Sequence, residues 1–280
     1  MRAEDGWRLR IEHVTTFLYS TPARASYNEV RQTPLTTGRQ TTLESGIRTA
    51  PHALQNSYWD YWGTQVVSFN VDAPHDELTI RGRALVETKV AEEPATATWD
   101  EVGGRSDRLS EYLAPSRYTE ATPHLVEVAA GLRRDTPQDT VRAVADWVHG
   151  SLEYMSGVTS VRTSAVEAFE AGRGVCQDFA HLAIAMLRLT GVPTRYVSGY
   201  LHPKPDAEIG NEVKGESHAW IESWLGQWWG LDPTNATEIG ERHVAVARGR
   251  DYADVAPVKG VFAGRADHST KVSVSITRVA

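Results

Sequence analysis

The sequence predicts an α+β protein in which a small N-terminal all-β domain precedes a mixed domain of helices and strands. The first ninety residues carry strand-like alternation, and no helical periodicity competes before residue 105. From residue 122 onward the chain carries helix start signals and one long apolar segment, and after Pro193 its pattern returns to β. Strands gathered ahead of helices are typical of the α+β class.

Four stretches of the N-terminal part alternate apolar and polar residues, as half-buried strands do. They are Trp7–Tyr19, Thr41–Ile47, Val66–Val71 and Leu78–Val90, the last interrupted by a bulge at Gly82. We expect the aromatic residues Tyr58, Trp59, Tyr61 and Trp62 to pack against the second domain. His13 and His52 are isolated, so structural roles are expected for both.

The only linker-like composition follows these strands, at Ala91–Thr98 and at Gly103-Gly104. The sequence therefore predicts a β-rich domain over residues 1–92, a linker with a short helix at Leu109–Leu113 over residues 93–122, and a core over residues 123–280. Within that core, Thr122-Pro123, Thr136-Pro137 and Thr163-Ser164 are helix start signals. They predict helices that end near Arg134, Leu152 and Phe169.

The next helix organises the chain, because it starts at the only cysteine of the 280 residues. From Cys176 it runs without a helix breaker to Gly191, and it is apolar on nearly all sides, so we expect it to be central. Free backbone N–H groups and the helix dipole favour an anion at its first turn, which favours a nucleophilic thiolate. A lone cysteine can also be a small buried hydrophobe, and the downstream sequence discriminates between the two readings.

Downstream, two aromatic-rich runs predict an antiparallel hairpin over Glu216–Asn235 with its turn at Leu225–Gln227. His218 and Asp232 lie toward the open end of this hairpin. A cysteine on a helix, followed by a histidine and then by an acid that can orient the histidine, is the arrangement of a thiol nucleophile and its base.

Several motifs resemble the bacterial transglutaminase-like proteins. They are Gly174–His181 (GVCQDFAH), Arg195–Tyr200 (RYVSGY), Ser217–Trp220 (SHAW) and Leu231–Thr234 (LDPT), and the resemblance spans roughly Pro123 to Asp254. It implies a papain-like transglutaminase core with Cys176 as nucleophile, His218 as base and Asp232 as the residue that orients His218. His13–Ser20 (HVTTFLYS) and Tyr61–Val66 (YWGTQV) resemble the β-rich region that is often fused to such cores.

Composition excludes several other classes of protein. A net charge of −7, without any run of five basic residues, argues against nucleic acid or an anionic membrane as the main partner. One cysteine cannot form an intramolecular disulfide, and neither a secretory signal nor a run of 18 apolar residues is visible, so we expect a cytoplasmic protein. No cofactor is expected. Cys176 and His181 project to opposite sides of the helix, so a zinc site is not expected either.

The predicted reaction is acyl transfer: His218 takes the thiol proton, the thiolate attacks an amide carbonyl, and the backbone N–H of Cys176 stabilises the oxyanion. Hydrolysis of a peptide or protein substrate is favoured, because the sequence shows no second substrate site that would hold an amine. An amine-accepting transglutaminase and a non-catalytic binding protein of the same fold are the alternatives, while an arylamine N-acetyltransferase fits the motifs poorly. Substrate identity, the oligomeric state and a second oxyanion donor, for which Tyr154 is a candidate, are not readable from the sequence.

Four other polar residues near the motifs receive structural interpretations. His181 faces away from the predicted base and is expected to be structural, while Glu216 and Glu222 are expected at the surface. Asp178 is expected to favour the N-terminus of the central helix. The polar stretch Pro203–Gly215 is expected to be a loop that contacts substrate.

Overall fold

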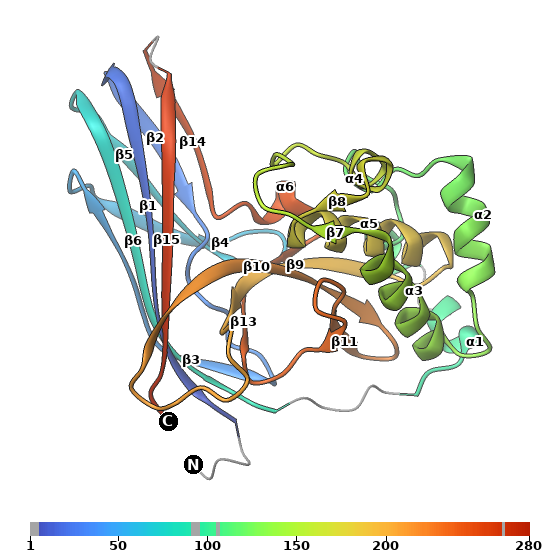
Figure 1. Ribbon diagram of the computed structural model, residues 1–280. Helices are drawn as coiled ribbons and strands as arrows, with labels where there is room; N and C mark the ends of the chain where they lie inside the picture. The colour runs from blue at the N-terminus through green and yellow to red at the C-terminus, as the bar shows by residue number, and fades with distance from the viewer. Residues whose placement is uncertain (1–5, 91–95, 105–106, 265–266) are drawn as a thin grey trace.

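The protein combines a broad β layer with a helical lobe, and one long bent strand, β10 (Glu212–Trp224), joins the two (Figure 1). The computed structural model describes residues 6–90, 96–104, 107–264 and 267–280. The predicted α+β class is confirmed. Residues 91–95 of the predicted linker lie outside the described residues, and the division of the chain at residue 92 stays a prediction.

All four stretches predicted as strands in the first ninety residues are strands, and the described residues form further strands along the chain. The strands are β1 (Arg8–Ala23), β2 (Ala25–Val30), β3 (Gln40–Ala50), β4 (Gln55–Trp59), β5 (Gln65–Val71), β6 (His75–Thr88), β7 (Glu153–Tyr154), β8 (Arg173–Gly174), β9 (Thr194–Leu201), β10 (Glu212–Trp224), β11 (Trp228–Asp232), β12 (Thr237–Glu238), β13 (His243–Gly249), β14 (Val258–Ala263) and β15 (His268–Arg278).

The described helices include all those that the sequence signals predict, together with two that were not predicted, at residues 99–103 and 252–255. They are α1 (Trp99–Gly103), the 3-10 helix η1 (Ser110–Tyr112), α2 (Pro123–Leu132), α3 (Pro137–Ser151), α4 (Ala165–Ala171), α5 (Cys176–Leu189) and α6 (Tyr252–Val255). Thr122, Thr136 and Ser164 each accept a hydrogen bond from a backbone N–H three residues later, so each caps its helix as predicted.

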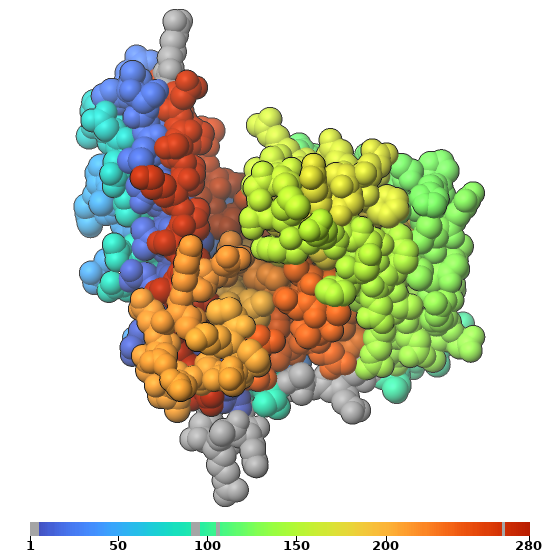
Figure 2. Space-filling model, in the orientation of Figure 1, coloured from blue at the N-terminus to red at the C-terminus, as the bar shows by residue number. Residues whose placement is uncertain are grey.

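The sheets show how the β layer and the lobe are tied together. One sheet has the strand order β12-β11-β10-β15-β1-β6-β3, in which β9 also pairs with β10 and β13 pairs with β9, and a second sheet has the order β14-β2-β5-β4. Residues 212–215 of β10 pair with β15, whereas residues 216–223 of the same strand pair with β9. The last two strands also pair with the first two, β15 with β1 and β14 with β2. The molecular surface is notched between this red strand layer and the green and yellow helices (Figure 2).

The hydrophobic core of the lobe is built around α5, whose residues from Gln177 to Arg188 are all buried. Helices α2, α3 and α4 pack against α5 together with β9 and β10. The prediction of a central helix that is apolar on nearly all sides is therefore confirmed. A small separate cluster lies where the β layer meets the lobe sheet, and it consists of Leu35, Val197, Trp220 and Ala245.

Two local predictions are wrong. Strand β6 pairs with β1 through Gly82 without a bulge, and a Cβ at Gly82 would lie 2.8 Å from Oε1 of the buried Gln32. The expected loop Pro203–Gly215 includes the start of β10, because β15 supplies pairing partners for residues 212–215 that the local sequence does not reveal. Strands β2, β4, β13 and β14 were not predicted, and β4 is exposed at every position, so it lacks the alternation of a half-buried strand.

We expect Gly199→Ala to lower the free energy of unfolding by about 2 kcal/mol or more, because overpacking a tight site is destabilising. Gly199 is buried in β9, and an added Cβ would lie 2.1 Å from the carbonyl oxygen of Val244 and 2.6 Å from the Trp220 ring. Gly150→Ala is the matched control, because nothing lies within 4 Å of its added Cβ and alanine favours its helix α3. Urea denaturation would measure both, and equal stability of the two variants would contradict this account of packing.

Candidate active site

The first turn of α5 is fixed by Asp178, the third residue of the helix. Its carboxylate Oδ2 accepts hydrogen bonds from the backbone N–H of Val175 at 2.8 Å and from the hydroxyl of Thr159 at 2.7 Å. Burial raises the pKa of Asp178, while these two hydrogen bonds act in the opposite direction. Asp178 therefore supports the helix start as predicted, and it leaves Cys176 half-buried at the first position of the helix.

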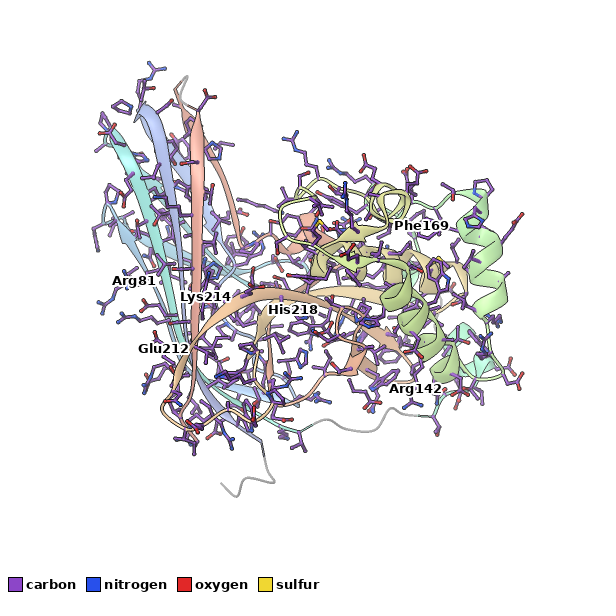
Figure 3. The ribbon with its side chains drawn as sticks, viewed as in Figure 1. Arg81, Arg142, Phe169, Glu212, Lys214 and His218 are labelled. Carbon is purple, nitrogen blue, oxygen red and sulfur yellow. The ribbon has the colours of Figure 1, made fainter. Side chains whose placement is uncertain are left out.

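His218 lies in the middle of β10, between the β layer and the helices (Figure 3). Its Nε2 lies 2.7 Å from Oδ2 of Asp232, and its side chain is only 9% exposed. Burial alone would lower the pKa of His218, but hydrogen bonds to Asp232 and Cys176, and the charges of both, raise it to about 10. Because Nε2 is committed to Asp232, Nδ1 is the ring nitrogen available to the thiol.

Asp232 ends β11 and is fully buried. Its Oδ1 accepts the backbone N–H groups of Thr234 at 3.0 Å and Asn235 at 3.2 Å, and its Oδ2 accepts Nδ2 of Asn235 at 2.6 Å in addition to His218. Burial opposes the charged form, yet hydrogen bonds from His218 and His243 hold the pKa of Asp232 well below its usual range. The structure thus brings together Cys176, His218 and Asp232, which are far apart in the sequence.

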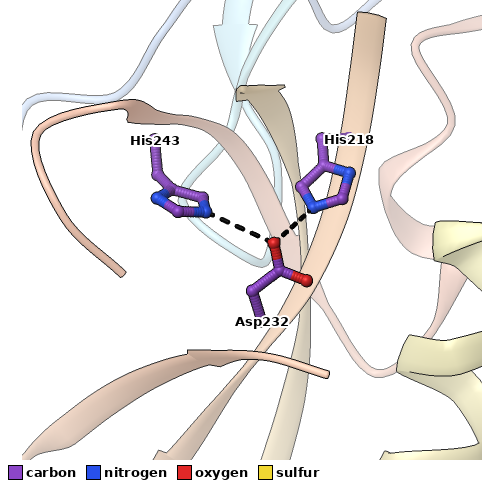
Figure 4. Close-up of side chains that lie close together, drawn as sticks. All are labelled: His218, Asp232 and His243. Carbon is purple, nitrogen blue, oxygen red and sulfur yellow. Dashed lines mark hydrogen bonds and ion pairs between the residues drawn. The ribbon is translucent and has the colours of Figure 1, made fainter. Parts of the chain in front are cut away.

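His243 is a third neighbour of the same carboxylate, and sequence reasoning missed it. Its Nε2 lies 3.4 Å from Oδ2 of Asp232, so both histidines meet one oxygen (Figure 4). The available signal was a histidine at the head of the apolar run Val244–Ala247, directly after the Gly240 turn. That signal was too weak, because His243 reaches Asp232 only when β13 pairs with β9.

A metal ion could in principle be held by a group of three described residues whose ligand atoms lie within 4.8 Å of one another. They are His218, Asp232 and His243. Two ligands on one tetrahedral zinc stand about 3.4 Å apart, given bonds of about 2.0–2.2 Å. The 2.7 Å separation of His218 and Asp232 is instead that of a hydrogen bond. A proton between these two atoms fits the geometry, and a metal would have to displace it.

Tyr154 lies on β7, which pairs in parallel with β8 just ahead of Cys176. Burial raises the pKa of Tyr154, and the charges of Cys176 and Glu216 raise it further. Its side chain is 47% exposed, so it faces solvent. The charge of a thiolate at Cys176 therefore acts on the phenol O–H of Tyr154.

His181 is a structural residue, as predicted. It is fully buried, stacks on Tyr118 with ring centroids 4.7 Å apart, and its Nε2 accepts the backbone N–H of Tyr252 at 3.1 Å. Burial, with a smaller contribution from the Arg188 charge, lowers the pKa of His181 to about 3, so the ring is neutral.

Two surface assignments need correction. Glu222 was expected at the surface, but it is buried between Arg195 and Arg248, whose guanidinium groups compensate its charge. Of the aromatic cluster expected to pack against the second domain, Trp59 is 67% exposed, and Tyr61 is 78% exposed and reaches the lobe only through a hydrogen bond from its hydroxyl to Glu111 and its edge contact with Trp62. The interpretation holds for Trp62, which contacts Tyr112 and Arg250 of the lobe.

The chain matches two protein-family models and is similar to several known proteins. Residues 126–233 match the family described as the transglutaminase-like superfamily, and residues 9–87 match the bacterial transglutaminase-like N-terminal region. An uncharacterised protein of Mycobacterium leprae is 45% identical over 98% of this chain and 100% of its own length. One of Mycobacterium tuberculosis is 33% identical over 96% of this chain and 91% of its own. The crystal structure of a candidate cysteine protease from Cytophaga hutchinsonii has a TM-score of 0.81 at 25% identity, over 99% of this chain and 92% of its own.

The raised pKa of His218 predicts a measurable titration. We expect its ring protons, followed by NMR, to titrate well above the ordinary value of about 6.5, and we expect Asp232→Asn to lower the midpoint. Because the folded-state pKa is raised, the stability that this proton contributes is complete below about pH 6.5 and is lost as the pH rises toward about 10. An unchanged midpoint in Asp232→Asn would show that the carboxylate does not act on the ring.

Proposed function

Since the chain belongs to the transglutaminase-like superfamily, with the bacterial transglutaminase-like N-terminal region ahead of its papain-like core, we propose that it is a thiol-nucleophile acyl-transfer enzyme that hydrolyses amide or peptide bonds. The observation that carries the proposal is the contiguous set of Cys176, His218 and Asp232, with a 2.7 Å hydrogen bond between the last two. The Cytophaga hutchinsonii relative, described as a candidate cysteine protease, supports the same chemistry.

In the proposed first half-reaction, Nδ1 of His218 takes the proton of Cys176, and the thiolate sulfur bonds to the carbonyl carbon of the amide. The carbonyl π electrons move to oxygen, where the backbone N–H of Cys176 at the helix start stabilises the negative charge. The tetrahedral species then collapses: its C–N bond breaks, the amine leaves with the proton from His218, and a thioester remains on Cys176.

In the second half-reaction, His218 accepts a proton from water, and the hydroxide formed attacks the thioester carbon. The C–S bond breaks, a carboxylic acid leaves, and the sulfur regains its proton from His218. Asp232 holds one ring orientation and one tautomer throughout, because Nε2 of His218 keeps its hydrogen bond to Oδ2. Burial supports this role, since a carboxylate with no exposed surface interacts strongly with the imidazolium.

Water is proposed as the acceptor because an amine needs an oriented site in order to compete with it. The acidic side chains ahead of His218 that could attract an amine, Asp206 and Glu208, are exposed and share a shallow cavity with Lys204. The proposed substrate is accordingly a peptide or protein cleaved by water. Among the described residues, no helix combines the length and the apolar character needed to cross a membrane; the cytoplasmic location and the absence of a nucleic-acid partner stay predictions.

The test supplies a cleavable peptide library together with a dansylated primary amine and follows both products. We expect free acid to form faster than the amine is incorporated, and Cys176→Ala to reduce both products by at least about 10³-fold while the fold, judged by circular dichroism, is unchanged. Faster incorporation of the amine would replace hydrolysis by transamidation. Turnover that survives in Cys176→Ala, or no turnover of any substrate by the wild type, would favour a binding protein instead.

Tyr154 is proposed as a second oxyanion donor, on the strength of its place beside Cys176. We expect Tyr154→Phe to lower kcat about 10- to 100-fold with little change in KM, because a donor that acts on developing charge affects mainly the transition state. Glu216→Gln is the control, since it removes a charge that acts on the phenol and keeps the hydroxyl. A Tyr154→Phe variant with a raised KM and an unchanged kcat would assign Tyr154 to substrate binding.

A further inference from the structure

We propose that His243 is a positioning residue that sets the base strength of His218 through the carboxylate of Asp232. This inference rests on the proposed function of the site. It depends on one oxygen atom, Oδ2 of Asp232, which accepts from His218 at 2.7 Å, from Asn235 at 2.6 Å and from His243 at 3.4 Å.

The tautomer of His243 follows from its other ring nitrogen. The backbone N–H of Gly240 points at Nδ1 of His243 from 3.3 Å, so Nδ1 accepts and the ring proton is carried by Nε2. That proton faces Oδ2 of Asp232. The ring is held in this orientation by Trp220, whose centroid lies 5.4 Å away in an edge-to-face contact.

His243 donates as a neutral ring. Burial lowers its pKa below the ordinary value, although the carboxylate of Asp232 acts in the opposite direction. The titratable and charged groups that face it are Asp232 on β11, His218 on β10 with its ring centroid 6.3 Å away, and the neighbouring Arg242. His243 therefore contributes an N–H dipole to Asp232 and no formal charge. Among the side chains of His218, Asp232 and His243, the formal charges are the carboxylate of Asp232 and, when it is protonated, the imidazolium of His218.

The position of the carboxylate does not need His243. Two backbone N–H groups hold Oδ1, and the side-chain amide of Asn235 holds Oδ2 at the shortest distance of the set. A residue that only filled the space could be apolar, which would avoid the cost of desolvating an imidazole. What the N–H of His243 adds is a dipole that attenuates the negative charge acting on His218.

The direction of the effect follows from this attenuation. Without the His243 donor, the carboxylate interacts more strongly with an imidazolium at His218, so the pKa of His218 rises and the ring becomes a weaker acid. A weaker acid protonates the leaving amine less readily. In the second half-reaction the sulfur of Cys176 is bound in the thioester, and His218 must be neutral in order to take a proton from water. A higher pKa of His218 lowers the fraction of neutral ring at neutral pH, so this step slows as well.

The experiment compares His243→Leu, which removes the donor, with His243→Gln, which can place an amide N–H near the position of Nε2. In His243→Leu we expect the NMR midpoint of His218 to rise by about 0.5–1 unit, and kcat at pH 7 to fall about 3- to 10-fold with KM within about twofold, since lost stabilisation of one protonation state appears in the pH profile. Activity should recover as the pH rises, and His243→Gln should restore the wild-type midpoint.

Two measurements keep the outcome decisive. In the wild type, nitrogen NMR should show the neutral Nε2–H tautomer of His243; an Nδ1–H tautomer would overturn the proposal even if His243→Leu does not fold. A loss of activity that is equal at every pH, or a lowered His218 midpoint, would also overturn it and leave His243 a packing residue. The NMR titration needs no substrate, so it separates failure of this inference from failure of the proposed hydrolysis.

Discussion

The burial of the Asp232 carboxylate is the constraint on which the site depends. A carboxylate without solvent is tolerated only when its oxygens are hydrogen-bonded and its charge is compensated. Here the donors come from three segments: His218 on β10, the backbone and side chain of residues 234–235, and His243 on β13. Satisfying one side chain therefore fixes the mutual positions of three parts of the lobe, and it leaves His218 with one free nitrogen for the thiol.

The β layer contacts β10 and β13, the two strands that carry His218 and His243. The backbone N–H of Leu35 donates to the carbonyl oxygen of Ala245 on β13 at 3.0 Å. The side-chain amide of Gln40 donates to the carbonyl oxygens of Leu35 and Ala245 and accepts from the backbone N–H of Ala245. Leu35 also packs on Trp220, the residue that orients His243. Because β10 leaves the lobe sheet to pair with β15, the strand that carries His218 is anchored in the same layer. The β layer, built from both ends of the chain, thus holds the two histidine strands in place, and it contains none of the three residues proposed to react.

Local signals in the sequence were sufficient for much of this. Helix α5 could be predicted because its start, its apolar surface and its end at Gly191 are properties of adjacent residues, and the same holds for the capped helices α2, α3 and α4. The hairpin of β10 and β11 was readable because its turn separates two aromatic-rich runs, and its open end carries His218 and Asp232. Residue order and spacing along the motifs then indicated the family.

The sequence alone was enough to nominate Cys176, His218 and Asp232 as the groups proposed to react, since each stands at a position marked by local pattern. The environment of those groups depends on the folded structure. Whether a charge such as that of Glu222 is buried depends on Arg195 and Arg248, which lie on other strands. His243 likewise becomes a partner of Asp232 only after β13 has paired with β9. Desolvation and hydrogen bonding act across space, and partners brought together by long-range strand pairing leave no mark on the residues next to them in the chain.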